Sequence, residues 1–210
     1  MVRKFALPIR LLCKNIIRKI GLGKCEAVNC GFQISRLLQD MTTKELNNTL
    51  REEGRFLGMC DEFYNEKWDY SLEQLVQRMF KGIDFCLQHH WPSNEFIKKN
   101  FKRDFLREQG VFVDDEYSIC NVQESLVLGG SKIRYRYSGK YYGNIRVRDL
   151  SLVEVTARGD GLVIIHLFER ACAKVKQSEK AKVAIIKHSP NVLVSASDGV
   201  RIVEEYDYLN

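Results

Sequence analysis

Between residues 151 and 203, apolar and polar positions repeat with a period of ten residues. Each unit opens a short run whose first, third and fifth positions are small or apolar, as in 151–155 and 161–165. Alternation at every second residue is typical of a β-strand that buries one face. Because the runs 171–175 and 181–185 keep the same parity, we expect these positions to form one continuous interior.

The intervening positions predict a longer structural period. Glu154 and Lys174 are charged, whereas Ile164 and Ala184 are apolar. An outer surface that changes character every ten residues indicates a repeat of twenty, which two strands per coil would produce. The pattern therefore predicts a short, flattened β-solenoid with two parallel sheets.

An antiparallel β-meander or sandwich is the alternative fold, since hairpins also preserve parity. The connections at Glu169-Arg170 and at 178–180 lack the residues that favour two-residue hairpin turns. Turn chemistry therefore favours coils over hairpins.

The preceding segment, 27–109, follows a helical period instead. Thr42 to Glu45 and Ser71 to Gln74 have capping-box spacing, and Ser93 is placed to cap a further helix. After Asp115 the period changes from 3.6 to 2. We therefore expect an α+β protein with a small helical bundle at 25–113 and a solenoid-like repeat domain at 114–210.

Residues 1–24 have an amphipathic pattern with seven basic and no acidic side chains, whereas the other 186 residues carry 26 basic and 27 acidic groups. This predicts a basic amphipathic helix. Its basic face could contact nucleic acid or, through residues 1–20, a membrane surface, or its apolar stripe could pack on its own domain. No apolar run is long enough for a transmembrane helix.

Seven scattered cysteines, an odd number, are typical of reduced thiols in a cytoplasmic protein rather than of a disulfide framework.

One outer face of the predicted solenoid is too apolar to remain in water. It is expected to be covered by the helical half, by a partner protein or by self-association. The residues assigned to this interaction surface are Leu162, Ile164, His166, Phe168 and Ile186. A non-enzymatic interaction or assembly module is therefore the leading expectation for function.

Basic residues also alternate along two predicted strands: Lys132, Arg134 and Arg136 on one, and Arg146 and Arg148 on the next. If these strands are neighbours, the five cations form a compact patch that could bind nucleic acid or another anionic polymer. A solvated sheet face is the simpler interpretation.

A metal-dependent or cysteine-dependent enzyme is the third hypothesis. Cys86, His89 and His90 have i, i+3, i+4 spacing and could share a metal or form a Cys–His pair. No orienting residue or family signature accompanies them, so we expect no catalytic residue, no metal site and no cofactor.

The stretches Gly82-Ile-Asp-Phe-Cys86 and Pro92-Ser-Asn-Glu-Phe-Ile97, followed by the repeat, give residues 42–203 a resemblance to a class of proteins. The chain resembles uncharacterised bacterial or phage proteins that join a helical segment to a short β-solenoid tail. This resemblance implies the fold and no activity.

Overall fold

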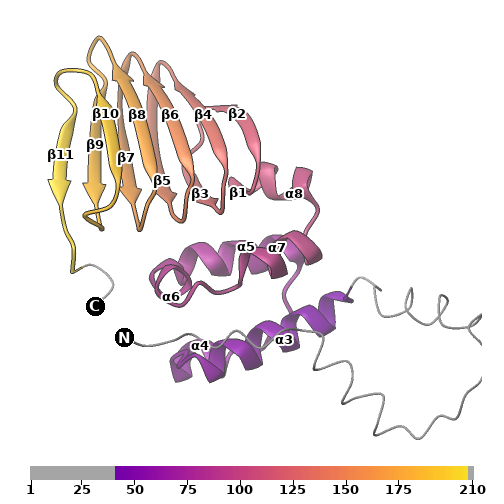
Figure 1. Ribbon diagram of the computed structural model, residues 1–210. Coiled ribbons are helices and arrows are strands. Elements are labelled where there is room, and N and C mark those ends of the chain that lie inside the picture. Colours follow the sequence, from indigo (N-terminus) through magenta and orange to yellow (C-terminus); the bar gives the residue numbers. More distant parts are fainter. Residues whose placement is uncertain (1–40, 208–210) are drawn as a thin grey trace, which may run out of the picture. The chain divides into compact units, whose positions relative to one another are not determined.

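The computed structural model describes residues 41–207, and the predicted helix at 1–24 lies outside them. Within these described residues, six helices precede eleven strands (Figure 1). The helices are α3 (Thr43–Phe56), α4 (Asp61–Tyr64), α5 (Leu72–Lys81), α6 (Ile83–His89), α7 (Asn94–Asn100) and α8 (Arg103–Glu108).

Local capping starts the helices where the sequence predicts. Thr42 and Ser71 both form complete capping boxes, with Glu45 and Gln74 returning a side-chain bond to the cap. Ser93 accepts a bond from the backbone N–H of Phe96 and so caps α7. Two helical stretches are each divided in two, one at Gly82 between α5 and α6 and one at Phe101 between α7 and α8.

The strands form two parallel sheets. The first has the order β1-β3-β5-β7-β9-β11 and the second β10-β8-β6-β4-β2. The strands are β1 (Val111–Val113), β2 (Glu116–Cys120), β3 (Glu124–Leu128), β4 (Lys132–Tyr137), β5 (Lys140–Val147), β6 (Leu152–Ala157), β7 (Asp160–Leu167), β8 (Cys172–Gln177), β9 (Lys182–Lys187), β10 (Leu193–Ala196) and β11 (Arg201–Glu204).

The register confirms the twenty-residue coil. Along the central coils each residue pairs with the one twenty positions further on, as in Val153 with Ala173 and Ile145 with Ile165. Every strand pair is parallel, so the antiparallel meander is wrong. The solenoid begins at Val111, three residues before the expected boundary at 114, because β1 already pairs with β3.

The interior consists of the predicted parity. Apart from Gly161, every first, third and fifth position of the units from 151 to 185 is buried. Large and small side chains complement one another across the interior: a Cβ at Gly143 would lie 2.6 Å from the hydroxyl of Tyr137. That hydroxyl donates to the carbonyl of Val122 (2.9 Å), and the hydroxyl of Tyr135 bonds to Ser125 Oγ (2.6 Å), so both buried tyrosines are hydrogen-bonded.

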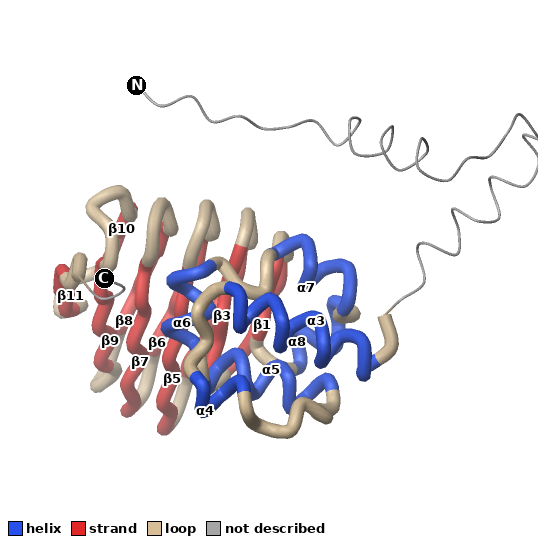
Figure 2. Tube along the Cα trace, turned by 90° about the horizontal axis from the view of Figure 1, so that it is seen from below, coloured by secondary structure: helices blue, strands red, loops and turns tan. Residues whose placement is uncertain are grey.

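The helices pack on the outer face of the first sheet. Their apolar side chains form one core with Val111, Val113, Leu126 and Leu128 of β1 and β3, and with Phe168 at the end of β7. Figure 2 shows the helices at the β1 end of this sheet, with β9 and β11 extending beyond them. The helical half is therefore a partial cover for the apolar outer face.

Candidate functional site

The predicted interaction surface is divided by this partial cover. Phe168 is 3% exposed within the helix–sheet core. Leu162 is 36% exposed, whereas Ile164 and Ile186 are half-buried. Val203 pairs with Ile186 in the register and extends the same row onto β11. We name Leu162, Ile164, Ile186 and Val203 the outer stripe.

Two histidines separate the outer stripe from the helical core. His166 Nδ1 and His188 Nε2 are 3.0 Å apart, and the His188 ring stacks on Phe168 with centroids 4.4 Å apart. Burial, together with the neighbouring His188 and Arg146, lowers the pKa of His166 to about 4. Burial also lowers the pKa of His188, so both rings are neutral at pH 7.

The outer stripe ends at a free strand edge. Among the described residues, β11 pairs with β9 alone. The N–H of Glu205 donates to the carbonyl of Lys187 (2.9 Å). Because successive residues of a parallel strand direct their backbone groups to opposite sides, the N–H and C=O groups of Ile202 and Glu204 are directed away from β9.

The predicted basic patch does not form. Lys132, Arg134 and Arg136 lie on β4 in one sheet, whereas Arg146 and Arg148 belong to β5 and its end in the other. The assumption that these strands are neighbours is wrong, because consecutive strands of a flattened coil belong to opposite sheets.

Three of these arginines already have protein partners. Arg134 pairs with Glu116 and Glu154, both at 3.3 Å, and Arg146 pairs with Glu124 at 2.7 Å. Arg148 is buried, and its Nη1 donates to the carbonyl oxygens of Cys86 (3.3 Å) and Leu87 (3.4 Å) at the end of α6. Anion binding by these five residues stays a prediction, now without a shared surface.

The predicted metal ligands on α6 have separate environments. Cys86 is buried, and burial raises the pKa of its thiol to about 12. The His89 ring packs against Phe85 with centroids 4.5 Å apart. His90 Nε2 instead lies 2.9 Å from Glu169 Oε1.

His90, Asp149 and Glu169 form the one group of three candidate ligands whose donor atoms lie within 4.8 Å in the described part of the chain. Its contacts are close approaches of the His90 ring to two carboxylates. Nε2 faces Glu169, whereas Nδ1 faces Asp149 at 3.9 Å, so the two ring nitrogens are directed to different carboxylates. Asp149 also accepts from Arg148 Nε (3.2 Å) and Asn94 Nδ2 (2.9 Å). The group joins the helical layer to two solenoid corners.

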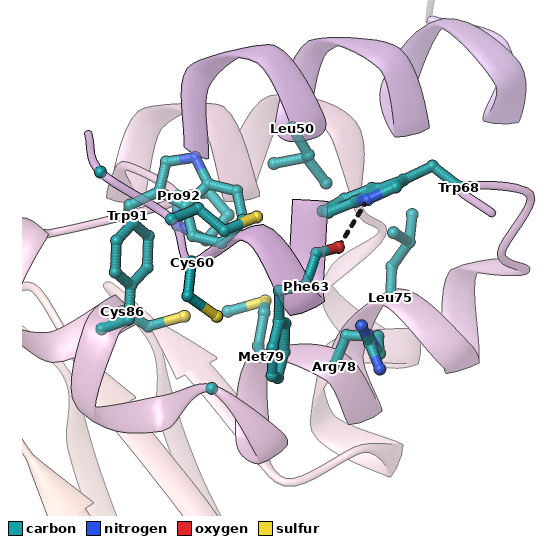
Figure 3. A pocket seen from close by; sticks show the side chains of 14 residues that line it. Leu50, Cys60, Phe63, Trp68, Leu75, Arg78, Met79, Cys86, Trp91 and Pro92 are labelled. Atoms are coloured by element: carbon teal, nitrogen blue, oxygen red, sulfur yellow. Dashed lines mark hydrogen bonds between the residues drawn. The ribbon is translucent and has the colours of Figure 1, made fainter. Parts of the chain in front are cut away.

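The helical layer also contains an apolar cavity that the sequence analysis did not predict; Figure 3 shows it from close by. Its volume is about 260 Å³, and its lining comes from four helices and three loops between residues 50 and 92. Residues so dispersed share no spacing that a sequence pattern could detect.

Among the helices of residues 41–207, none combines the length and the apolar character needed to cross a membrane. Comparison with protein-family models, with curated proteins and with solved structures finds no match to this chain.

Proposed function

We propose that the protein is a non-enzymatic assembly module that binds a second copy of itself through the free edge of β11. The observation that carries the proposal is this edge, which continues the outer stripe and has no neighbouring strand among residues 41–207. An unpaired strand edge offers backbone donors and acceptors to another strand. A two-fold axis would bring two identical edges together antiparallel.

The backbone favours one register. With the axis at Val203, residue 202 of one copy lies opposite residue 204 of the other. These are the residues whose N–H and C=O groups are directed away from β9. They would exchange both hydrogen bonds, and the two Val203 residues would form the closer, non-hydrogen-bonded pair between them.

The side chains are complementary in the same register. Arg201 would lie opposite Glu205 of the second copy, and the pair occurs twice because of the two-fold axis. The two Val203 side chains would join the outer stripes of both copies into one apolar row. Charge and apolar contact therefore favour the same alignment.

A four-residue edge is small beside ordinary stable interfaces, so we expect a weak dimer. Sedimentation velocity of the full chain over a range of protein concentrations would measure it. The expected result is a reversible monomer–dimer equilibrium, and a monomer at every concentration would overturn the proposal.

A charge exchange tests the register. Arg201→Glu would place like charges opposite each other twice and should abolish the dimer, whereas Arg201→Glu combined with Glu205→Arg should restore it. Both side chains are exposed, so neither change should affect folding. A dimer that tolerates Arg201→Glu would contradict this edge as the interface.

A matched pair of lysine substitutions tests the contribution of the outer stripe. Val203→Lys would place two ammonium groups at the two-fold axis and should prevent dimerisation. Ser195→Lys adds the same charge to the exposed outer face of β10 in the other sheet and should leave the dimer unchanged. Equal effects of the two variants would indicate net charge rather than a specific contact.

A further inference from the structure

The cavity of the helical layer lies between α3, α4, α5 and α6, and its walls are almost entirely apolar (Figure 3). Four aromatic side chains, two methionines and two leucines supply most of this lining, among them Trp68, Trp91 and Phe63. Protein interiors are normally packed as densely as organic crystals. A space of about 260 Å³ in a layer of six short helices is therefore an exception to be explained.

Water is a poor occupant of this space. A buried water needs two to four polar partners, and apolar cavities of about 150 Å³ remain dry and accept benzene. The present cavity is larger and can hold a molecule with a longer or bicyclic apolar body.

Two buried N–H groups of the lining have neither a hydrogen bond nor an ion pair within the described chain: Nε1 of Trp91 and Nε of Arg78. The other indole of the cavity differs, since Trp68 Nε1 donates to the carbonyl of Phe63 (3.1 Å). Buried donors without an acceptor are rare in folded proteins. Both belong to side chains that line the same cavity.

The guanidinium of Arg78 is held in place by other contacts. Its Nη2 pairs with Glu66, and its Cζ lies 4.3 Å from the centroid of the Phe63 ring. Glu66 thus balances the charge of Arg78. Nε is therefore available as a hydrogen-bond donor at a fixed position rather than as part of an unpaired positive charge.

We propose that this cavity binds a small apolar molecule that carries one acceptor oxygen, a carbonyl or carboxylate, which accepts a hydrogen bond from Trp91 Nε1 or Arg78 Nε. The aromatic and thioether walls hold the apolar body, and the acceptor satisfies a buried donor. The loop after α3 provides the entrance, because Gly58 and Cys60 line the cavity and are exposed.

The chain contains two tryptophans, Trp68 and Trp91, and both line the cavity. Intrinsic tryptophan emission of the full-length protein therefore reports on this site. We would titrate three optically silent probes, octanoate, 2-octanone and n-heptane, and measure the same binding by calorimetry. Saturable one-to-one binding is expected, with the two oxygen-bearing probes binding more tightly than heptane. The order of octanoate and 2-octanone distinguishes a carboxylate ligand from a neutral carbonyl one.

Trp91→Phe keeps an aromatic ring and removes the free donor. It should weaken binding of the preferred oxygen-bearing probe by roughly three- to tenfold, the worth of one hydrogen bond, and leave heptane unchanged. Trp68 remains as the reporter. Arg78→Met is the corresponding change at the second donor, and at least one of the two variants must show this selective loss.

A cavity-filling variant locates the binding site. Cys86→Met extends a buried lining residue with a flexible apolar chain. It should raise the thermal midpoint of the unliganded protein and weaken the binding of all three probes. General destabilisation does not produce this combination. Absence of saturable binding by every probe would overturn the proposal. Equal affinities for heptane and the oxygen-bearing probes, or unchanged binding by Cys86→Met, would overturn it as well.

Discussion

The solenoid turns its corners with residues in the left-handed region. At one edge, Gly139, Gly159, Glu179 and Gly199 have φ of 78°, 90°, 64° and 82°, and they lie twenty residues apart. Gly129, Asp149 and Glu169 repeat the pattern at the other edge, with φ of 71°, 66° and 55°. Positive φ is unfavourable for side chains other than glycine. Coil geometry therefore imposes a cost at each non-glycine corner.

Glu179→Gly should stabilise the protein. Glu179 is exposed and has no ion pair or hydrogen bond in the described structure that the substitution would remove. Relief of the left-handed conformation should raise the free energy of unfolding by about 1 kcal/mol, less the entropy that glycine adds to the unfolded chain. Urea denaturation would measure the change, and a decrease would show that this corner is unstrained.

Gly159→Ala is the converse test one coil earlier. A Cβ there would lie 2.5 Å from the carbonyl oxygen of Gly139, and φ is +90°. The short contact and the positive φ both disfavour alanine, so we expect the free energy of unfolding to fall by about 2 kcal/mol or more. An alanine variant as stable as the parent in the same urea series would contradict the close approach of successive corners.

The corners also show what the sequence could have revealed. Gly139, Gly159 and Gly199 are separated by multiples of twenty residues, a period that coils require and hairpins do not. Inward parity was predictable because each inward side chain meets the same environment in every coil. The environment of His166 was not predictable, since it depends on Phe168 and on helices distant in sequence.

His166 gives the protein a specific acid sensitivity. Its pKa is about 4 in the folded protein and 6.5 in the unfolded chain, so the unfolded state binds the proton first as the pH falls. Stability should therefore be complete above pH 6.5 and decline towards pH 4. Allowing for the partial exposure of the ring, the loss should be about 2 kcal/mol.

His166→Gln removes this titration and keeps a hydrogen-bonding side chain next to His188. Urea denaturation of both proteins at a series of pH values isolates the histidine, because the carboxylates are common to both. The difference in unfolding free energy between the parent protein and His166→Gln should become smaller as the pH falls. A constant difference would show that His166 is not kept neutral by folding.

At the level of elements, Arg148 connects the helical layer to the solenoid. Its side chain is 3% exposed and reaches the carbonyl end of α6, Asn94 on α7 and the corner carboxylate of Asp149. A cation at the end of a helix is favoured because carbonyl groups there have no intrahelical partner. Strict strand alternation places Arg148 beside Arg146 on an open face, but α6 and α7 cover that position and bury Arg148.

Arg148→Met should lower the free energy of unfolding by about 3 kcal/mol, because it leaves buried carbonyls and Asp149 without their cation. Arg134→Met is the matched control, since its ion pairs are exposed and should contribute less than about 1 kcal/mol. Chemical denaturation would compare them. Equal losses would show that Arg148 does not join the two layers.

At the level of the whole molecule, two apolar cores share strands. Val127 of β3 faces the solenoid interior, whereas Leu126 and Leu128 of the same strand face the helices. The helical layer therefore supports the β1 end of the solenoid. At the other end Ile202, inward by register, is 49% exposed because no described coil follows it.

This asymmetry predicts a gradient of stability along the solenoid. Coils are stabilised mainly by their neighbours, so an end without one should open most readily. In hydrogen exchange, amides of β5 and β7 should be the slowest and those of β11 among the fastest. Uniform protection across the coils would contradict the gradient.

The same experiment separates fraying from assembly. The N–H of Glu205 is already bonded to Lys187, whereas those of Ile202 and Glu204 are directed outward. If β11 pairs with a second copy, raising the protein concentration should slow exchange at Ile202 and Glu204 severalfold, because pairing supplies acceptors that the monomer lacks. The β10 amides provide the control, since that edge belongs to the other sheet and should not respond. Exchange at Ile202 that is independent of concentration, at concentrations where the protein is dimeric, would place the interface elsewhere.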